Sequence, residues 1–300
     1  MKAFVFLNNK SGKSEGEKYY NTYLKNFIKN NYSKFVFINL PCKDDEYRIN
    51  DIDNLESNCI FIIGGDGTVS ITIENIMKNS IFTNLNIPIY ICPFGSGNGL
   101  AKNLNINPYN LRLDGDKKYI YPMDIEYNNN SYFSFLCQTW GVISDIDINT
   151  EFLRCIGDFR FYYGILKSIF NPKYYEGKID ITTIDNDNII IHGKFNLLCA
   201  SNAPWISNDF KIASKANIFS NEIDILIIRR ELSFFERIKL IYNTLIGKTH
   251  ELDFIEYHKI HKYNLEIFDD DSMIVRDGEI VNSNKINVKS TDKKFLFYSF

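Results

Sequence analysis

Long hydrophobic runs are missing from this 300-residue sequence, and no apolar stretch is long enough to span a lipid bilayer. The apolar segment at the N-terminus, residues 3–7, is too short for a signal peptide, and no small-residue cleavage site follows it. This segment therefore predicts a first β-strand, and the expected location is the cytoplasm.

Cysteine pairs and an excess of basic charge are also missing. The six cysteines are scattered without a C-x-x-C pair, and several lie in apolar segments, which favours core thiols in a reducing compartment over disulfides or zinc. His258 and His261 are three residues apart, but no acid or cysteine cluster completes a metal site, so a solvated strand or loop is the better interpretation. The formal net charge of −3 argues against a nucleic-acid partner.

The pattern of apolar residues divides the chain into two parts. Residues 1–110 alternate strand and helix, which predicts a parallel sheet with helices on its faces. A first helix would begin with a capping box formed by Ser14 and Glu17. Residues 111–300 show short alternating segments between Asn, Asp and Gly turns, which predict a mainly antiparallel β-sandwich. Its last strand is free to return towards the first domain.

Two helical stretches interrupt the second part. One covers roughly residues 150–170. The other begins at Ser233, where Glu236 would complete a second capping box, and Gly247 is placed to end it.

The most informative stretch is Gly-Gly-Asp-Gly-Thr at residues 64–68, which follows the apolar run 59–63. A buried strand there delivers the carboxylate of Asp66 into a turn with glycine on both sides. Glycine allows positive φ and lets a large anion approach the backbone. The helix that can begin at residue 69 would turn its first N–H groups towards that anion. The pattern predicts a phosphate site with a general base beside it.

A second turn of the same kind follows the apolar run 87–92. It reads Pro-Phe-Gly-Ser-Gly-Asn-Gly at residues 93–99 and leads into a helical pattern at 100–104. Either turn alone is a weak signal, because many α/β proteins carry glycine where a strand meets a helix. Two such turns at this spacing favour a ligand site at the ends of the strands, where open α/β sheets bind their ligands.

A third group of polar residues lies in the second part of the chain. A strand ends in Trp-Gly at 140–141 and is followed by Asp145 and Asp147, then by Arg154 and Arg160. The two arginines are six residues apart and would not share one face of a regular helix. They are either surface ion pairs with nearby acids or two guanidinium groups that reach a triphosphate.

These segments resemble the lipid kinase superfamily of diacylglycerol, ceramide and sphingosine kinases, and are most similar to the sphingosine kinases. The resemblance rests on the turns at 64–68 and 95–98, the run 140–161, and Asp-Gly-Glu at 277–279, and their order and spacing agree over nearly the whole chain. The first turn alone is shared with NAD kinase and phosphofructokinase. The Gly-Ser-Gly-Asn turn and the run 140–161 are far more specific.

The resemblance implies an N-terminal nucleotide-binding α/β domain, a C-terminal domain that holds the lipid, and an active site in the cleft between them. It implies ATP and Mg²⁺ as cofactors and a sphingoid base as the substrate. Asp66 would contact this lipid as the general base on its primary hydroxyl, Asp145 would bind its headgroup through the amine, and Asp277 would lie at the metal. The residues implied for nucleotide binding are Asn9, Ser11, Gly64, Gly65, Gly67, Thr68, Ser96, Gly97, Asn98, Arg154, Arg160 and Glu279.

The chemistry of these residues agrees with the resemblance. Phosphoryl transfer needs positioning and charge neutralisation, which arginines and helix N-termini supply, and one acid must take the hydroxyl proton. An acid at Asp145 suits a cationic amine and gains nothing from diacylglycerol, which has none. The sequence departs from the family at Ile71, where an acid is usual and the nearest acid is Glu74, and at Asn8-Asn9, where Asn-Pro is usual.

Three other interpretations stay open. Ceramide or diacylglycerol kinases use the same chemistry, and Asp145 is acidic in those relatives too. An NAD kinase would leave the run 154–161 unexplained. A catalytically inactive lipid-binding protein is opposed by the presence of Asp66, Asp277 and Glu279. A lipid substrate also implies peripheral contact with a membrane, for which the aromatic and basic residues at 170–175 are a candidate, although an ordinary helix end over the core fits them equally well.

Overall fold

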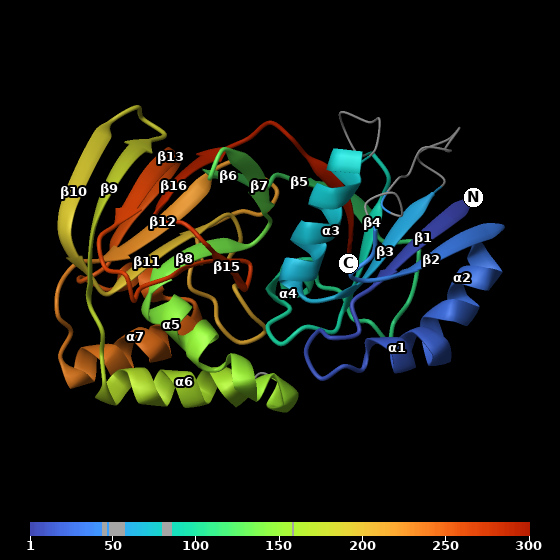
Figure 1. Ribbon diagram of the computed structural model, residues 1–300, viewed down its shortest axis with the longest axis horizontal. Coiled ribbons are helices and arrows are strands. Elements are labelled where there is room, and N and C mark those ends of the chain that lie inside the picture. Colours follow the sequence, from blue (N-terminus) through green and yellow to red (C-terminus); the bar gives the residue numbers. More distant parts are fainter. Residues whose placement is uncertain (44–46, 48–57, 80–85, 158) are drawn as a thin grey trace.

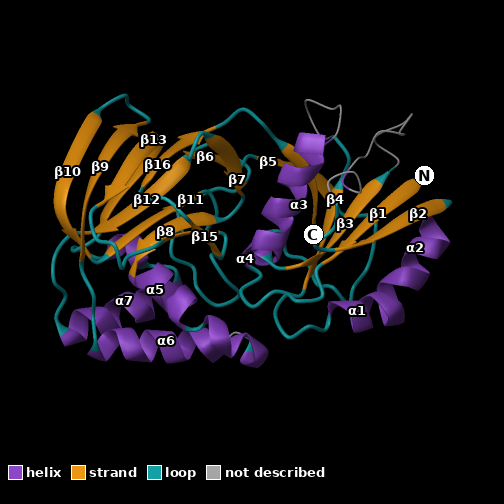
Figure 2. Cartoon of the chain, viewed as in Figure 1, coloured by secondary structure: helices purple, strands orange, loops and turns teal. Residues whose placement is uncertain are grey.

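The computed structural model describes residues 1–300 except 44–46, 48–57, 80–85 and 158. The side chains of residues 154 and 155 also lie outside the description. The chain forms two sheets that lie side by side, with helices packed against each of them and between them (Figures 1 and 2). Within the described residues, no helix combines the length and the apolar character needed to cross a membrane.

The first sheet has six strands in the order β2-β1-β3-β4-β17-β5. Neighbours from β2 to β17 run parallel, and β5 is antiparallel to β17. Nearly every residue of β1, β3 and β4 is buried, since helices cover both faces of a parallel sheet. The bounds of the six strands are β1 Lys2–Leu7, β2 Lys34–Asn39, β3 Cys59–Gly64, β4 Ile89–Pro93, β5 Asp116–Ile120 and β17 Phe295–Ser299.

Helical segments connect these strands. A continuous helix follows β1, made of α1 (Gly16–Tyr19), a π-helical turn (Tyr20–Leu24) and α2 (Lys25–Asn31). After β3 comes α3 (Asp66–Asn79), and after β4 the short α4 (Gly99–Asn103). The predicted capping box at Ser14 is wrong, because Ser14 has a left-handed backbone (φ 59°) and the side chain of Asn9 accepts the hydrogen bond from the Glu17 amide instead.

The second domain is an antiparallel sheet of eleven strands. Strand β13 pairs with β12 along its first half, and with β16 and β9 along its second, so the sheet turns there and its two parts share one core around Trp140, Phe195 and Tyr263. The bounds are β6 Met123–Tyr127, β7 Asn130–Ser134, β8 Cys137–Gly141, β9 Tyr175–Thr183, β10 Asn188–Phe195, β11 Leu197–Ser201, β12 Ile223–Ile228, β13 Glu256–Ile267, β14 Ile274–Arg276, β15 Glu279–Val281 and β16 Lys285–Ser290. The predicted fold class, a parallel α/β domain followed by an antiparallel β domain, is confirmed.

Three helices cover one side of the second domain (Figure 2). They are α5 (Val142–Asn149), α6 (Phe159–Phe170) and α7 (Phe234–Ile246), with 3₁₀ turns at Glu151–Ile156 and Thr249–Glu251. The capping box at the start of α7 is confirmed: Ser233 and Glu236 exchange side-chain and backbone hydrogen bonds. Gly247 follows the helix with φ 71°, as a C-terminal glycine should.

The two domains share strands at their border. The predicted division at residue 110 falls before β5, and β5 pairs in the first sheet, so the chain leaves that sheet only after Ile120. The last strand, β17, lies between β4 and β5. Helix α3 lies between the first sheet and β7 of the second domain, which places its first residue, Asp66, at the border (Figure 1).

Candidate active site

The two glycine turns meet at the carboxyl ends of β3 and β4. A Cβ atom placed on Gly95 would lie 2.4 Å from the Cα atom of Gly65, so the two backbones are in direct contact. The loop after β1 joins them, because a Cβ on Gly12 would lie 2.4 Å from the carbonyl oxygen of Phe94. Three loops therefore converge at the edge of the sheet where such folds bind ligands.

Asp66 is the acid at this convergence. Its Oδ2 accepts a hydrogen bond from the amide of Gly99 (3.0 Å), and its Oδ1 accepts one from the amide of Leu100 (2.9 Å), both in the first turn of α4. Burial, with a further contribution from the negative charge of Asp277, raises the pKa of Asp66 to about 6, against the effect of those two amides. A carboxyl group that titrates near neutral pH is suited to accept and release a proton.

The other residues of the first turn shape the backbone around Asp66. A Cβ on Gly64 would lie 2.7 Å from the side chain of Thr68, and Thr68 accepts a hydrogen bond from Nδ2 of Asn8 (3.0 Å). A Cβ on Gly67 would lie 2.8 Å from Oε1 of Glu279. The absence of side chains at Gly64 and Gly67 thus allows Thr68 and Glu279 to approach the turn.

Not all residues predicted to bind nucleotide line the cavity. Ser11, Ser96 and Gly97 do, together with Gly65, Gly67 and Thr68. Asn98 instead forms two hydrogen bonds with the backbone of Gly95 (2.8 Å each) and holds the second turn in shape. Asn9 holds Glu17 at the start of α1, and its neighbour Asn8 lines the cavity.

Asp277 was predicted to lie at the metal, but its carboxylate is fully engaged with the protein. It accepts hydrogen bonds from the hydroxyls of Ser70 and Ser134 and from the backbone amides of Phe135, Leu136 and Cys137, at 2.5–3.1 Å. Five donors leave its two oxygens little capacity for a cation. Among the described residues, no group of three or more acids, histidines or cysteines is arranged to hold a metal ion. A direct bond from Asp277 to Mg²⁺ does not fit this geometry.

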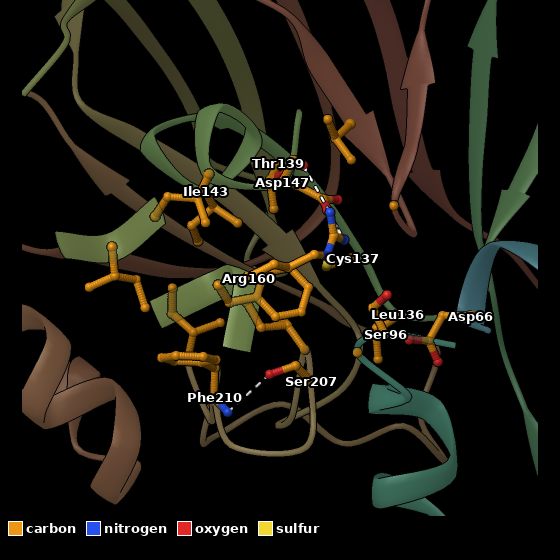
Figure 3. A pocket seen from close by; sticks show the side chains of 18 of the residues that line it. Asp66, Ser96, Leu136, Cys137, Thr139, Ile143, Asp147, Arg160, Ser207 and Phe210 are labelled. Carbon is orange, nitrogen blue, oxygen red and sulfur yellow. Dashed lines mark hydrogen bonds and ion pairs between the residues drawn. The ribbon is translucent and has the colours of Figure 1, made fainter. Parts of the chain in front are cut away.

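Arg160 and Asp147 form an ion pair in the middle of the cavity (Figure 3). Arg160 lies in the first turn of α6 with only 5% of its side chain exposed, and it donates to the carboxylate and the backbone carbonyl of Asp147 and to Glu151. Its Nε atom is buried without a hydrogen-bond partner among the described residues. Both residues line the cavity. The side chain of Arg154, the other predicted arginine, is outside the described residues.

The two acids of α5 point in different directions. Residues two apart on a helix lie on nearly opposite faces, so Asp145 and Asp147 cannot both face the cavity. Asp147 lines the cavity, and its Oδ2 lies 3.7 Å from the position of a Cβ on Gly278. Asp145, predicted to bind the lipid headgroup, is not among the lining residues. Its two carboxylate oxygens accept from the hydroxyl of Tyr175 (2.8 Å each), and burial raises its pKa.

The cavity extends from the glycine turns into an apolar chamber between the second sheet and helices α5 to α7. It holds about 230 Å³ and joins Asp66 and Ser96 at one end to Ile143 and Phe210 at the other, with Arg160 and Asp147 between them (Figure 3). The apolar side chains that line the chamber are Val142, Ile143, Ile146, Phe161, Ile165, Ile169, Ile206, Phe210, Ile212, Leu240 and Ile241. Such a cavity suits a molecule with a polar head and a hydrocarbon tail.

Comparison with known proteins agrees with this arrangement. Residues 2–116 match the family described as the diacylglycerol kinase catalytic domain. The chain is 24% identical to sphingosine kinase 2 of Arabidopsis thaliana over 83% of its own length and 62% of that protein. It is 21% identical to sphingosine kinase 1 of the same plant over 99% of its length and 72% of that protein. The chain belongs to the lipid kinase superfamily.

The fold of this lipid kinase superfamily member is also found in a solved structure. A crystal structure of a diacylglycerol kinase from Bacillus anthracis superposes with a TM-score of 0.66 over 100% of this chain and 97% of that one, at 13% identity. At this identity the likeness concerns the fold. The chain spans 62% of the length of the first relative named above.

Sequence reasoning missed two residues of the site. Asn8 was passed over for Asn9, and Asp147 for Asp145, although each pair of candidates stood in the same motif. The available signal was helical periodicity: Asp147 and Ile143 are four residues apart and so share a face of α5, and both line the cavity. Periodicity alone would not have told which face of α5 turns inwards.

Proposed function

We propose that this protein is an ATP-dependent lipid kinase that transfers the γ-phosphoryl group to the primary hydroxyl of a sphingoid base. One observation carries the proposal: a single cavity joins the glycine turns around Asp66 to an apolar chamber, with an acid, Asp147, at the junction. One continuous cavity can therefore hold both the phosphates and a hydrocarbon tail.

In the proposed reaction, the lipid hydroxyl oxygen attacks the γ-phosphorus of ATP. A bond forms between this oxygen and phosphorus, the bond from phosphorus to the bridging oxygen breaks, and ADP leaves with that oxygen. Asp66 takes the hydroxyl proton and later releases it to solvent. Phosphoryl transfer of this kind depends on positioning and charge neutralisation more than on covalent chemistry from the protein.

The polar residues around the turns would hold the nucleotide. We assign Ser11, Ser96, Gly97 and the backbone of Gly65 to the phosphate side, because they line the cavity next to Asp66. Glu279 lies against Gly67 at the same place. A Mg²⁺ ion that enters with ATP would be held chiefly by phosphate oxygens and water, since the carboxylate of Asp277 is already saturated by five donors.

Asp147 takes the place that the sequence suggested for Asp145. A sphingoid base carries an ammonium group two bonds from the reacting hydroxyl carbon, and a carboxylate at the cavity wall would attract it. Asp147 lies at the wall, whereas Asp145 is bound to Tyr175 outside the lining. Arg160 would neutralise Asp147 before substrate arrives and turn its unpartnered Nε atom towards a ligand.

The chamber favours a lipid over a soluble dinucleotide. An NAD kinase would place a polar molecule where most of the wall is made of isoleucine, leucine, valine and phenylalanine side chains, and polar groups lose hydrogen bonds in such surroundings. A catalytically inactive lipid-binding protein would need neither the raised pKa of Asp66 nor the glycine contacts between the two turns. Ceramide and diacylglycerol remain the alternatives within lipid phosphorylation.

We also propose that the outer face of helices α6 and α7 contacts the membrane in which the substrate resides. The inner faces of both helices line the chamber, and their outer faces carry exposed apolar side chains. The ring centroids of Phe170 on α6 and Phe234 on α7 are 5.8 Å apart. This α6–α7 face consists of Phe159, Tyr162, Tyr163, Leu166, Phe170, Phe234, Phe235, Ile238 and Tyr242. Of the residues that the sequence suggested, Phe170 belongs to it and Tyr175 is buried.

The test is transfer of labelled phosphate from Mg·ATP to sphingosine, dihydrosphingosine, ceramide and diacylglycerol, with Asp66→Asn beside the unchanged protein. Label in the sphingoid bases only, lost in the variant while ATP still binds, is the expected result. Label in another lipid would support phosphoryl transfer to a lipid and would contradict the sphingoid base as the substrate. No label in any lipid, followed by phosphorylation of NAD, would overturn the proposal.

A further inference from the structure

Helix α3 presents a row of polar residues at intervals of four. Asp66, Ser70 and Glu74 share one face because four residues make slightly more than one helical turn. Ser70 donates to Oδ2 of Asp277, and Glu74 binds Arg276 and accepts from the amide of Phe133 at 2.6 Å. The face that begins with the proposed base is therefore attached to the second domain at each of the next two turns.

The Glu74–Arg276 ion pair is one of the two attachments, and both are buried. The side chains of Arg276 and Glu74 are only 5% and 7% exposed. Arg276 also donates to the carbonyl oxygen of Phe133, so one strand residue of β7 is bound through its amide to Glu74 and through its carbonyl to Arg276. Burial raises the pKa of Glu74, and the positive charge of Arg276 is the largest influence that opposes this.

The two attachments are adjacent in the second domain. Arg276 ends β14 and Asp277 follows it directly with φ 48°, so the backbone turns there and sends the two side chains to successive turns of α3. Two points of attachment on one face oppose both rotation of the helix about its axis and sliding along it. Asp66, at the first residue of α3, moves with the helix.

We propose that the Glu74–Arg276 pair is a positioning device that holds α3 in register with the second domain and thereby fixes Asp66 against its substrate. Neither residue lines the cavity. Their action on Asp66 is transmitted along eight residues of helix, a distance of about 12 Å. A buried ion pair contributes little net stability compared with apolar residues of the same size, so a role in register explains its place better than stability does.

The effect on turnover rests on the proposed function, but the position of Asp66 can be measured without it. The amides of Gly99 and Leu100 donate to the carboxylate of Asp66, so their hydrogen exchange reports whether Asp66 keeps its place. Misplacement of a reacting group by about 1 Å can cost on the order of a hundredfold in rate. A shift of α3 should therefore appear in exchange and in kcat together.

The experiment compares Arg276→Met, Arg276→Lys, Glu74→Gln and a control, Lys259→Met. Lys259 on β13 pairs with Glu222 and with the buried Asp224 on β12, and none of the three lines the cavity, so the control breaks a partly buried pair without touching α3. Melting temperature, amide exchange in peptides that cover residues 97–104, and kcat and KM for lipid are measured on each.

We expect Arg276→Met and Glu74→Gln to speed the exchange of the two amides at least tenfold and to lower kcat about ten- to a hundredfold, with KM for lipid changed less than threefold. Arg276→Lys should recover part of both losses. If Arg276→Met does not fold, Glu74→Gln decides, because its amide can still accept from Phe133. Lower melting temperatures with exchange and kcat equal to those of Lys259→Met would overturn the inference. An unchanged protein that phosphorylates no lipid would overturn the proposed function, and the exchange data would still decide the positioning.

Discussion

Gly65 and Gly95 are in backbone contact across the ends of two neighbouring parallel strands: a methyl group on Gly95 would lie 2.4 Å from the Cα atom of Gly65. Neither residue needs glycine for a left-handed backbone, since neither has a positive φ. They are glycine because two loops occupy space that a single Cβ would fill. The site is thus built by close approach of backbones, with the carboxylate of Asp66 beside the point of contact.

Gly95→Ala should therefore weaken ATP binding more than it weakens the fold. The added methyl pushes the two turns apart, and we expect the Kd for ATP to rise at least tenfold, measured by calorimetry. Gly193→Ala is the control: φ at Gly193 is 129° and no atom lies within 4 Å of the added methyl, so it introduces backbone strain alone, far from the turns. Equal ATP affinity in both variants would contradict the assignment of these turns to the nucleotide.

The pKa of Asp66 predicts the acid side of the pH profile. Burial raises this pKa from 3.8 to about 6, so the carboxyl is protonated below pH 6 and cannot accept the hydroxyl proton. We expect kcat to fall about tenfold per pH unit below 6 and to level off above it. Single-turnover rates between pH 4.5 and 8 measure this, with circular dichroism at each pH to verify the fold. A half-point near 4 would point to an ordinary exposed carboxyl as the base.

The two acids of α5 should behave differently when they are neutralised. Asp147→Asn should lower kcat/KM for a sphingoid base about ten- to a hundredfold, which is the worth of a hydrogen bond to a charged group. It should leave any activity on diacylglycerol nearly unchanged, because that lipid has no amine. Asp145→Asn, bound to Tyr175 away from the cavity, should change neither rate by more than a few-fold.

The comparison of the two lipids separates recognition from damage. Asp147→Asn removes the anion beside the buried Arg160, so some loss of stability is expected, and melting temperatures are measured alongside. A loss that is equal for both lipids would show that the variant is merely unstable. A larger loss of kcat/KM in Asp145→Asn than in Asp147→Asn would indicate that Asp145 binds the headgroup, as the sequence suggested.

The α6–α7 face predicts the response to vesicles. Phe235 is 79% exposed, and its removal from water by a bilayer is worth about 1.5–3 kcal/mol. Phe235→Ser should lower partitioning to phosphatidylcholine vesicles about tenfold or more in a sedimentation assay and leave activity on detergent-dispersed lipid unchanged. Ile190→Ser, at a residue 63% exposed on β10, is the matched control and should bind as the unchanged protein does. Equal losses of vesicle binding in both variants would contradict membrane contact through this face.

The parts of this molecule that could be predicted from its sequence are those set by local pattern. The strands β1, β3 and β4 are continuous apolar runs, and the turns after β3 and β4 are marked by glycine, so the sheet and the place of Asp66 followed directly. The capping box at Ser233 was found because its partner is three residues away. Local signals were misleading at Ser14, where Asn9 from the preceding loop provides the cap.

The remaining features depend on residues that are distant in sequence. The carboxylate of Asp277 accepts hydrogen bonds from the backbone amides of residues 135–137, which lie about 140 positions earlier in the chain. No local sequence motif predicts a partner at that distance. The choice between Asp145 and Asp147 depends on which face of α5 packs against β8 and which against α6. Glu74 finds Arg276 across the domain border. The first two contacts form within the second domain, and only the third crosses the domain border.

The position of β17 has a consequence for the order in which this protein can be made. The first sheet is complete only when Phe295–Ser299 has been inserted between β4 and β5, so a ribosome must deliver almost the whole chain before the edge of β4 is covered. Until then the first domain exposes one unpaired edge of an apolar strand, Ile89–Pro93, and such an edge can pair with other chains. Synthesis of the second domain is therefore the interval during which the first one is open to aggregation and to chaperones.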